Sequence, residues 1–360
     1  MGPLIFLSNY NMRAVITLLR LCDKYDVAVW IVADGEDDPI FLTRYASNVV
    51  AIRKPRDVGD FIDILRSLQK KFAENPAFVA PTSEYLNRYL LQNKEMLRQW
   101  NIHVPLPRQE LYDSVSDKLM FHGLCKKFGL CVPDIFDVEN IIFPCYAKPV
   151  SYYGYMGKPV LLNSKEELSK LHLSHPQANW FYQKQIEGES YYLLYYFSKK
   201  GNVIKFSQKN IAQQKGGRSI LAACNADLHL TSISDEYEKM FRTIGYSGPV
   251  MVEIRKNEQG MFMIEANPRP WGPSQFTVDA RIPIFGSFIS DMGYDVCLDE
   301  RVTDDECYYF WENGFDGSMD NADYFSVSQN AIAGNLEKWR KYDIFNRDDT
   351  RALYQNWKLL

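Results

Sequence analysis

The sequence predicts an α/β protein in which a parallel-sheet lobe precedes a second lobe built largely from strands. Over the first hundred residues, short apolar runs alternate with helical patterns, and from about residue 145 the apolar runs follow one another closely. Alternating strands and helices are typical of a parallel sheet with crossover helices, whereas runs of strands favour an α+β arrangement. A third observation, a hairpin carrying two carboxylates, indicates where the function resides.

The N-terminal lobe is expected over residues 1–110. Apolar runs predict its strands at residues 4–7, 27–32, 48–52 and 78–80. Apolar residues at i, i+3, i+4 spacing predict a helix after the first strand and another over residues 58–72. The turn after the first strand lacks a G-x-G-x-x-G pattern, so no dinucleotide site is expected there.

Pro105 and Pro107 indicate a stiff connection to a second lobe, which is expected over residues 111–300. A helix is expected from about Ser116 to Gly129, and a capping box at residues 164–167 opens another. Apolar runs predict strands at residues 145–150, 160–162, 180–185, 191–197 and 203–208. Residues 301–360 show no clear periodicity and are expected to form an extension packed on the second lobe.

Composition excludes several classes of protein. The net charge of −4 provides no basic field for nucleic acid, and no apolar run approaches the ~20 residues that span a bilayer. The seven cysteines include no C-x-x-C pair, so neither a zinc site nor a disulfide framework is expected. Free thiols and the absence of a signal-peptide pattern favour the cytoplasm.

The strongest signal is a predicted hairpin at residues 248–267. Two alternating apolar runs flank Glu258-Gln259-Gly260, with glycine at the bulge position of the turn. If these three residues form the turn, Asn257 pairs with Met261, and Glu253 lies opposite Glu265. In this register Asn267 shares the face of the two carboxylates, and four apolar residues face the core: Val252, Ile254, Ile264 and Ala266.

Two carboxylates directly opposite each other on a sheet repel, so something must compensate their charge. A divalent cation held by Glu253, Glu265 and the Asn267 amide oxygen would do so, and hard oxygen donors suit Mg²⁺. The alternatives are a solvated polar face, or pairing of the two glutamates with Arg255 and Arg269.

At this hairpin the sequence resembles the ATP-grasp superfamily. Glu253, Glu265 and Asn267 occupy the positions of its magnesium ligands, in the pattern E…E-x-N-P-R. The continuation Arg269-Pro-Trp-Gly is most similar to ATP-grasp enzymes related to amino-acid ligases and carbamoyl-phosphate synthetase. The resemblance implies a pre-ATP-grasp lobe followed by a two-subdomain ATP-grasp fold. It also implies that Arg269 holds a transferring phosphoryl group or a substrate carboxylate.

Further family motifs follow in the expected order. Lys118, in an Asp-Lys pair, and Lys148, in Ala-Lys-Pro, match lysines that reach nucleotide phosphates. Residues 151–157 match the glycine-rich loop over the phosphates, with Gly154 and Gly157 as its glycines. This loop departs from the family by carrying Tyr and Met where small residues are common.

The segment from Gln183 to Glu189 resembles the hinge between the two subdomains. The family pairs adenine with backbone groups of the hinge, here those of Lys184 and Ile186, and holds the ribose with an acidic residue, here Glu189. Basic residues after the hinge meet the γ-phosphate or the acyl phosphate in this family. The candidates for this role, among which the sequence does not decide, are Lys209, Lys215 and Arg218.

Each of these assignments has a structural alternative. Lys148 could be an edge-strand lysine kept for solubility, and Lys118 a solvated residue at a helix start. Glu189 could be a turn carboxylate, and Arg269 a structural partner of one hairpin glutamate.

The resemblance implies a ligase that uses ATP and Mg²⁺, with Mn²⁺ as an alternative metal. It would activate a carboxylate as an acyl phosphate, join it to an amine, and release ADP and phosphate. Small molecules are the expected substrates, with amino acids or short peptides favoured. The rival interpretations are an ATP-grasp kinase and a catalytically silent nucleotide-binding module. The sequence indicates no oligomeric state.

Overall fold

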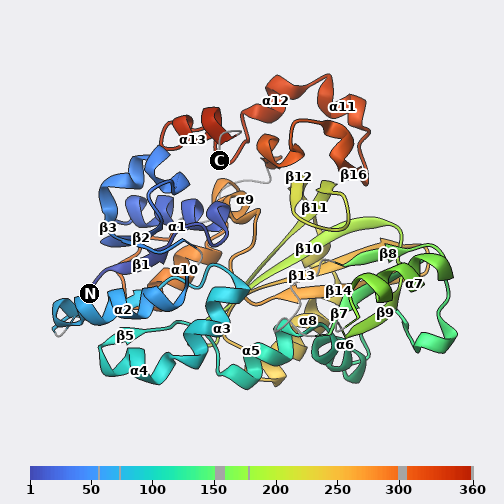
Figure 1. Ribbon diagram of the computed structural model, residues 1–360, viewed down its shortest axis with the longest axis horizontal. Helices are drawn as coiled ribbons and strands as arrows, with labels where there is room; N and C mark the ends of the chain where they lie inside the picture. The colour runs from blue at the N-terminus through green and yellow to red at the C-terminus, as the bar shows by residue number, and fades with distance from the viewer. Residues whose placement is uncertain (56, 73, 151–158, 177–178, 299–305, 358–360) are drawn as a thin grey trace.

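The protein is described by a computed structural model that covers residues 1–55, 57–72, 74–150, 159–176, 179–298 and 306–357 (Figure 1). These residues form three sheets: a parallel sheet near the N-terminus, a large mostly antiparallel sheet at the centre, and a small antiparallel sheet at one end. The α/β class and the parallel N-terminal lobe are therefore confirmed.

The N-terminal sheet has the strand order β3-β2-β1-β4-β5. Its strands are β1 (Leu4–Leu7), β2 (Val29–Asp34), β3 (Val49–Arg53), β4 (Ala77–Val79) and β5 (Ile102–His103). The helices of this lobe are α1 (Met12–Lys24), α2 (Gly59–Leu68), α3 (Glu84–Gln92) and α4 (Lys94–Gln99). The first four strands were predicted, whereas β5 holds only two residues and leaves no periodic signal.

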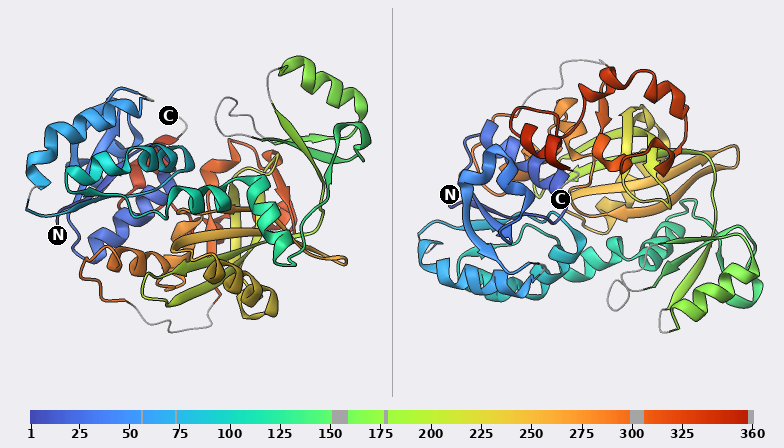
Figure 2. Two further views of the ribbon diagram at one scale, coloured as in Figure 1. Left: turned by 90° about the horizontal axis from the view of Figure 1, so that it is seen from below. Right: turned by 45° about the horizontal axis from the view of Figure 1, so that its top comes forward.

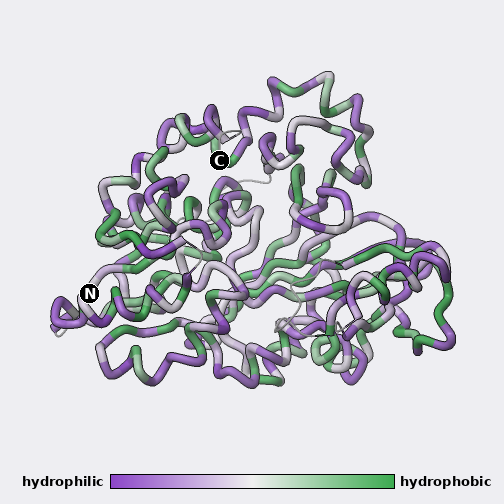
Figure 3. The backbone as a smooth tube through the Cα atoms, viewed as in Figure 1, coloured by the Kyte–Doolittle hydropathy of each residue, from purple (hydrophilic) through white to green (hydrophobic). Residues whose placement is uncertain are grey.

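The large sheet has the order β14-β13-β10-β11-β12-β15, and β16 pairs with β11. Its strands are β10 (Glu189–Phe197), β11 (Val203–Gln214), β12 (Ile220–Asn225), β13 (Gly248–Asn257), β14 (Gly260–Asn267), β15 (Tyr308–Phe310) and β16 (Ala322–Tyr324). β10 is buried along nearly its whole length because both faces of the sheet are covered. Figure 3 shows apolar residues concentrated along these central strands.

Helices cover both faces of the large sheet. One face packs against α5 (Gln109–Ser116), α6 (Lys118–Lys127) and α8 (Ser232–Thr243) through a core that includes Leu193 and Phe241. The other face packs against α9 (Ser274–Asp279) and α10 (Ile284–Ser290), which lie between the sheet and α1. This second core joins the N-terminal lobe to the rest of the molecule.

The small sheet has the order β6-β9-β7-β8. It contains β6 (Ile135–Phe136), β7 (Cys145–Pro149), β8 (Val160–Leu162) and β9 (Trp180–Lys184), and it is covered by α7 (Lys165–Ser174). The serine half of the predicted capping box is present at the start of α7, where Ser164 Oγ accepts a hydrogen bond from the Glu167 N–H at 3.3 Å. Glu167 Oε2 accepts from the Asn163 N–H at 2.7 Å, one residue before the N-cap. Figure 2 shows this sheet and α7 at one end of the molecule, beside the large sheet.

The C-terminal segment contributes to the large sheet through β15 and β16, and continues into α11 (Gln329–Ala333), α12 (Leu336–Arg340) and α13 (Arg351–Asn356). Its far end is held to α1, where Arg20 donates two hydrogen bonds to the Asp349 carboxylate at 2.8 and 2.9 Å. The segment is therefore part of the central sheet as well as a surface extension.

Two expectations about the large sheet were wrong. β11 continues to Gln214, six residues past its predicted end, because buried polar residues such as Gln208 and Asn210 hide the strand pattern. β12 was not expected, since its small residues give a weak strand signal. Within the described residues, no helix combines the length and apolar character required to cross a membrane.

Candidate active site

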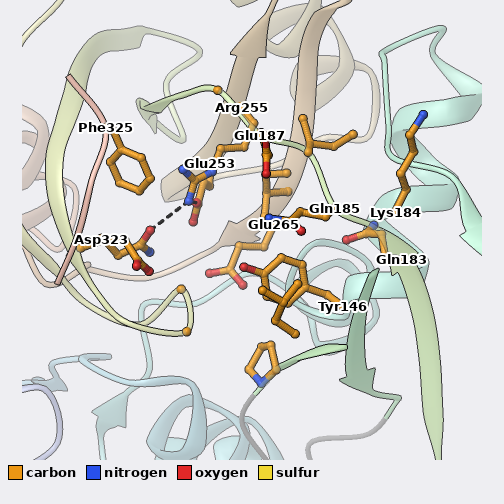
Figure 4. A pocket seen from close by; sticks show the side chains of 18 of the residues that line it. Tyr146, Gln183, Lys184, Gln185, Glu187, Glu253, Arg255, Glu265, Asp323 and Phe325 are labelled. Carbon is orange, nitrogen blue, oxygen red and sulfur yellow. Dashed lines mark hydrogen bonds and ion pairs between the residues drawn. The ribbon is translucent and has the colours of Figure 1, made fainter. Parts of the chain in front are cut away.

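A cavity of about 540 Å³ lies where the small sheet faces the large sheet, with the connection between β9 and β10 along one side (Figure 4). Its size suits a nucleotide-sized ligand. The side chains and glycines that line it come from both sheets, this connection and the C-terminal segment: Tyr146, Lys148, Pro159, Leu161, Gln183, Lys184, Gln185, Ile186, Glu187, Gly188, Glu189, Gln213, Gly216, Gly217, Glu253, Arg255, Ile264, Glu265, Asp323, Tyr324 and Phe325.

The carboxylate hairpin has the predicted pairing of Glu253 opposite Glu265, but reaches it by a different route. The turn contains two residues, not three, so Asn257 lies opposite Gly260 and the expected pairing with Met261 is wrong. A bulge at Ile264 then shifts the register by one residue and restores the alignment of the two carboxylates.

The bulge also changes which side chains face the core. Ile264 was expected in the core, but it lines the cavity, and Met263 is buried in its place. Met263 is held there by its N–H, which donates a 3.0 Å hydrogen bond to the Cys131 carbonyl. The bulge thus adds an apolar side chain to the cavity wall beside Glu265.

Each hairpin carboxylate is next to one cation. Arg255 Nη2 lies 3.3 Å from Glu253 Oε1, and Lys118 Nζ lies 3.5 Å from Glu265 Oε2. Burial raises the pKa of Glu253 despite the neighbouring Arg255. Burial also acts to raise the pKa of Glu265, but Lys118 and Lys148 outweigh it and hold that pKa below the usual range. The pair therefore favours an added positive charge.

Lys148 lies on β7, on the opposite side of the cavity from the hairpin. The residue is only 5% exposed, and its Nζ donates a 2.6 Å hydrogen bond to Gln183 Oε1. Burial, with a smaller effect from Lys118, lowers the pKa of Lys148 to about 8. Its side chain is not the exposed solubility lysine of the alternative interpretation.

The predicted hinge residues lie together along the cavity. The Lys184 N–H donates to the Asp134 carbonyl at 2.8 Å, whereas the Ile186 N–H has no hydrogen-bond partner within the described part of the chain. Glu189 accepts hydrogen bonds from Lys209 Nζ at 2.5 Å and Tyr191 Oη at 2.7 Å, and these lower its pKa. The Ile186 N–H is thus available to a ligand.

The basic candidates after the hinge are not gathered at the carboxylates. Residues directly opposite in an antiparallel pair share a face, so Tyr192 and Gln208 lie on the Glu253 face, and Lys209 lies on the other. Lys215 and Arg218 are exposed in the turn between β11 and β12, although Gly216 and Gly217 between them line the cavity.

Asn267 and Arg269 continue the hairpin in a chain of hydrogen bonds. Asn267 Nδ2 donates to Glu265 Oε1 at 2.9 Å, and Arg269 Nη2 donates to Asn267 Oδ1 at 2.9 Å. Arg269 Nε is buried and has no partner within the described residues, and Arg269 is not among the residues that line the cavity. Gly154 and Gly157 lie outside the described residues.

Several cavity residues were missed by sequence reasoning. Tyr146, Leu161 and Gln213 are not part of the motifs and carry no signal of their own. Asp323 and Phe325 were missed because residues 301–360 lack periodicity. Arg255 was considered only as a partner for a glutamate, although alternation along β13 places it on the Glu253 face.

Within the described ranges, no group of three or more His, Cys, Asp or Glu side chains is arranged to hold a metal ion. The hairpin offers a different donor set, two carboxylates and one amide. The seven cysteines are free thiols.

No family model and no curated protein matches the chain. Solved structures match it with TM-scores above 0.5. Rhizobium etli pyruvate carboxylase has a TM-score of 0.65 and 14% identity over 85% of this chain, which spans only 31% of that protein. The biotin carboxylase domain of Hydrogenobacter thermophilus 2-oxoglutarate carboxylase, solved with MgADP and bicarbonate, has a TM-score of 0.62 and 17% identity, covering 82% of this chain and 71% of that one.

A third similar structure is an ADP complex of N5-carboxyaminoimidazole ribonucleotide synthetase, with a TM-score of 0.61 and 16% identity over 86% of this chain and 81% of that one. At such low sequence identities the structural similarity establishes the fold. The activity has to be argued from the residues of the site. Biotin carboxylase and this synthetase are both ATP-grasp enzymes. The chain therefore has the ATP-grasp fold that its motifs predicted, preceded by a parallel-sheet lobe.

Proposed function

We propose that this chain is an ATP- and Mg²⁺-dependent ligase that joins a small-molecule carboxylate to an amine and releases ADP and phosphate. The observation that supports this most directly is the pair Glu253 and Glu265, opposed on the hairpin and faced by Lys148 across a nucleotide-sized cavity. Similar structures contain ADP or MgADP.

The residues present fit a magnesium ion. Glu253, Glu265 and Asn267 provide hard oxygen donors on neighbouring strands. A bound Mg²⁺ would offset the charge of the terminal phosphates and of the two carboxylates.

The chain's own residues then have separate tasks. The backbone of Lys184 and Ile186 orients the adenine, and Glu189 holds the ribose. Lys148, which faces the carboxylate pair across the cavity, and Lys118, whose Nζ lies 3.5 Å from Glu265 Oε2, bind phosphate oxygens. Arg269, which continues the hairpin beside Asn267, holds the substrate carboxylate or the phosphoryl group in transfer. Lys209 is the ion-pair partner of Glu189, and Lys215 and Arg218 would reach a phosphate only if the β11–β12 turn closed over the cavity.

In the reaction, a carboxylate oxygen attacks the γ-phosphorus, and the bond from that phosphorus to the β-bridging oxygen breaks, which releases ADP. The amine then attacks the acyl carbon, phosphate leaves, and the amine proton passes to solvent. Enclosure of the cavity between the two sheets would limit hydrolysis of the acyl phosphate.

The substrates can be proposed by chemical class. The similar structures include one with bicarbonate and a synthetase of a carboxyaminoimidazole ribonucleotide, so amino acids or peptides have no support from them. We therefore propose a small carboxylate, bicarbonate included, as the activated substrate. Free thiols and the need for ATP favour a cytoplasmic enzyme.

A screen of small acids, bicarbonate and amines with MgATP tests this proposal. The ligase should release ADP and phosphate, and hydroxylamine should trap the activated carboxylate as a hydroxamate. A phosphorylated product without free phosphate would instead indicate a kinase. Nucleotide binding without turnover across the screen would indicate a silent module, and formation of AMP and pyrophosphate would contradict the acyl-phosphate route.

A further inference from the structure

The C-terminal segment reaches into the nucleotide cavity. β16 pairs with the end of β11, with Tyr324 opposite Ala212 and Asp323 opposite Gln213. This pairing brings Asp323 and Phe325 to the cavity wall, where Figure 4 shows them beside Arg255. A segment far from the family motifs therefore forms part of the site.

Arg255 is held from three sides. Its guanidinium carbon lies 4.3 Å from the centre of the Phe325 ring, a cation–π contact. Its Nη2 donates to Gln213 Oε1 at 2.9 Å and lies 3.3 Å from Glu253 Oε1. The side chain is 14% exposed. Within the described part of the chain, Nε and Nη1 make no hydrogen bond, so a fixed guanidinium presents free donors to the cavity.

The position of Arg255 on β13 indicates which part of a nucleotide it would meet. Glu253 lies two residues toward one end, and Asn257 lies two residues toward the other. Asn257 Nδ2 donates a 3.0 Å hydrogen bond to the Glu187 carbonyl in the hinge. Arg255 therefore lies between the hinge and the carboxylate pair, about 7 Å along the strand from each flanking residue.

We propose that Arg255 binds the α-phosphate of the nucleotide and that Phe325, from the C-terminal segment, positions it. This inference rests on the proposed nucleotide site. A nucleotide with its base at the hinge and its terminal phosphates at Glu253 passes Arg255 with its ribose and α-phosphate. The C-terminal segment is thereby a component of nucleotide binding rather than a cover over the fold.

Affinities for adenosine, AMP, ADP and ATP, measured by calorimetry without turnover, test this assignment. Phe325→Leu should weaken binding of AMP, ADP and ATP by a similar factor of roughly 3- to 10-fold and leave adenosine unchanged. Phe325→Tyr, which keeps the ring face, should stay within about twofold of the wild type. Arg255→Gln should weaken all three phosphorylated ligands by at least about tenfold.

A matched control is Trp100→Leu, which removes the ring 5.5 Å from Arg66 in the N-terminal lobe and should leave every affinity unchanged. Losses confined to ATP and ADP would place Arg255 at the terminal phosphates and overturn the assignment. Unchanged affinities in folded Arg255→Gln protein would show a purely structural role and also overturn it. A wild-type protein that binds none of the four ligands would instead refute the proposed function itself.

Discussion

The two walls of the cavity differ in how they are supported. The large-sheet wall carries Glu253 and Glu265, and the sheet to which they belong has an extensive core on each face. The small-sheet wall carries Lys148 on a sheet covered by one helix, with a small core that includes Leu162 and Leu171. We infer that the carboxylate wall is the stable one, and that the lysine wall can move as a unit to admit and enclose a ligand.

The largest effect is expected on the stable wall. Glu265→Gln should abolish turnover, by at least about 100-fold, because it removes one of two carboxylates that compensate the metal charge. The change relieves the repulsion by Glu253 but also removes the carboxylate that pairs with Lys118, so the fold should persist with a small net change in stability. Steady-state ATPase or ligase assays and a thermal melt measure the two outcomes.

Glu258→Gln, in the exposed turn of the same hairpin, is the matched control and should keep full activity. Magnesium-dependent turnover that survives in Glu265→Gln would remove the carboxylate pair from the mechanism.

On the other wall, Lys148→Ala should weaken ATP binding by at least about tenfold, because a charge-assisted hydrogen bond contributes roughly 1.5–3 kcal/mol. Lys170→Ala, an exposed lysine on α7, serves as control for the same sheet. Calorimetric titration with ATP distinguishes them, and equal affinities for the two variants would show that Lys148 meets no phosphate.

Two core substitutions compare the stability of the two cavity walls. Leu193→Ala in the large-sheet core and Leu171→Ala on the buried face of α7 should each lower local stability by about 2–4 kcal/mol. Leu193→Ala should lower the global melting temperature. Leu171→Ala should chiefly speed hydrogen exchange in β7, β8 and β9. Equal exchange changes across both sheets would mean that the two walls unfold as one unit.

The smallest effect is expected outside both walls, at Asp349. Burial acts to raise the pKa of this carboxyl, but the hydrogen bonds from Arg20 outweigh it and lower the pKa. A depressed folded-state pKa adds stability above the unfolded value near 4, and this stability is lost as pH falls through the lower folded pKa. Asp349→Asn should therefore lower the melting temperature by a few degrees at pH 7 and much less at pH 3.

The same contrast explains what the sequence could predict. The pairing of Glu253 with Glu265 was predicted correctly because two errors cancelled. The turn is one residue shorter than expected, and the bulge at Ile264 restores the alignment of the two carboxylates. Lys148 and the hinge were predictable as motifs. Asp323 and Phe325 could not be predicted as cavity residues, because pairing of β16 with β11 is a long-range contact that leaves no local pattern. Lys209 could not be placed either, since its face depends on a strand whose end was misjudged.

The hydrogen-bonded ion pair between Arg20 and Asp349 has a consequence for biosynthesis. The two residues are 329 positions apart, so α1 lacks its partner until nearly all of the described chain has been translated. At typical elongation rates the interval is roughly 15–65 s. During that time the nascent N-terminal lobe exposes the part of α1 that α9 and the C-terminal segment later cover. We expect chaperone dependence to be greatest in that interval, and a slow-translating host to lengthen it.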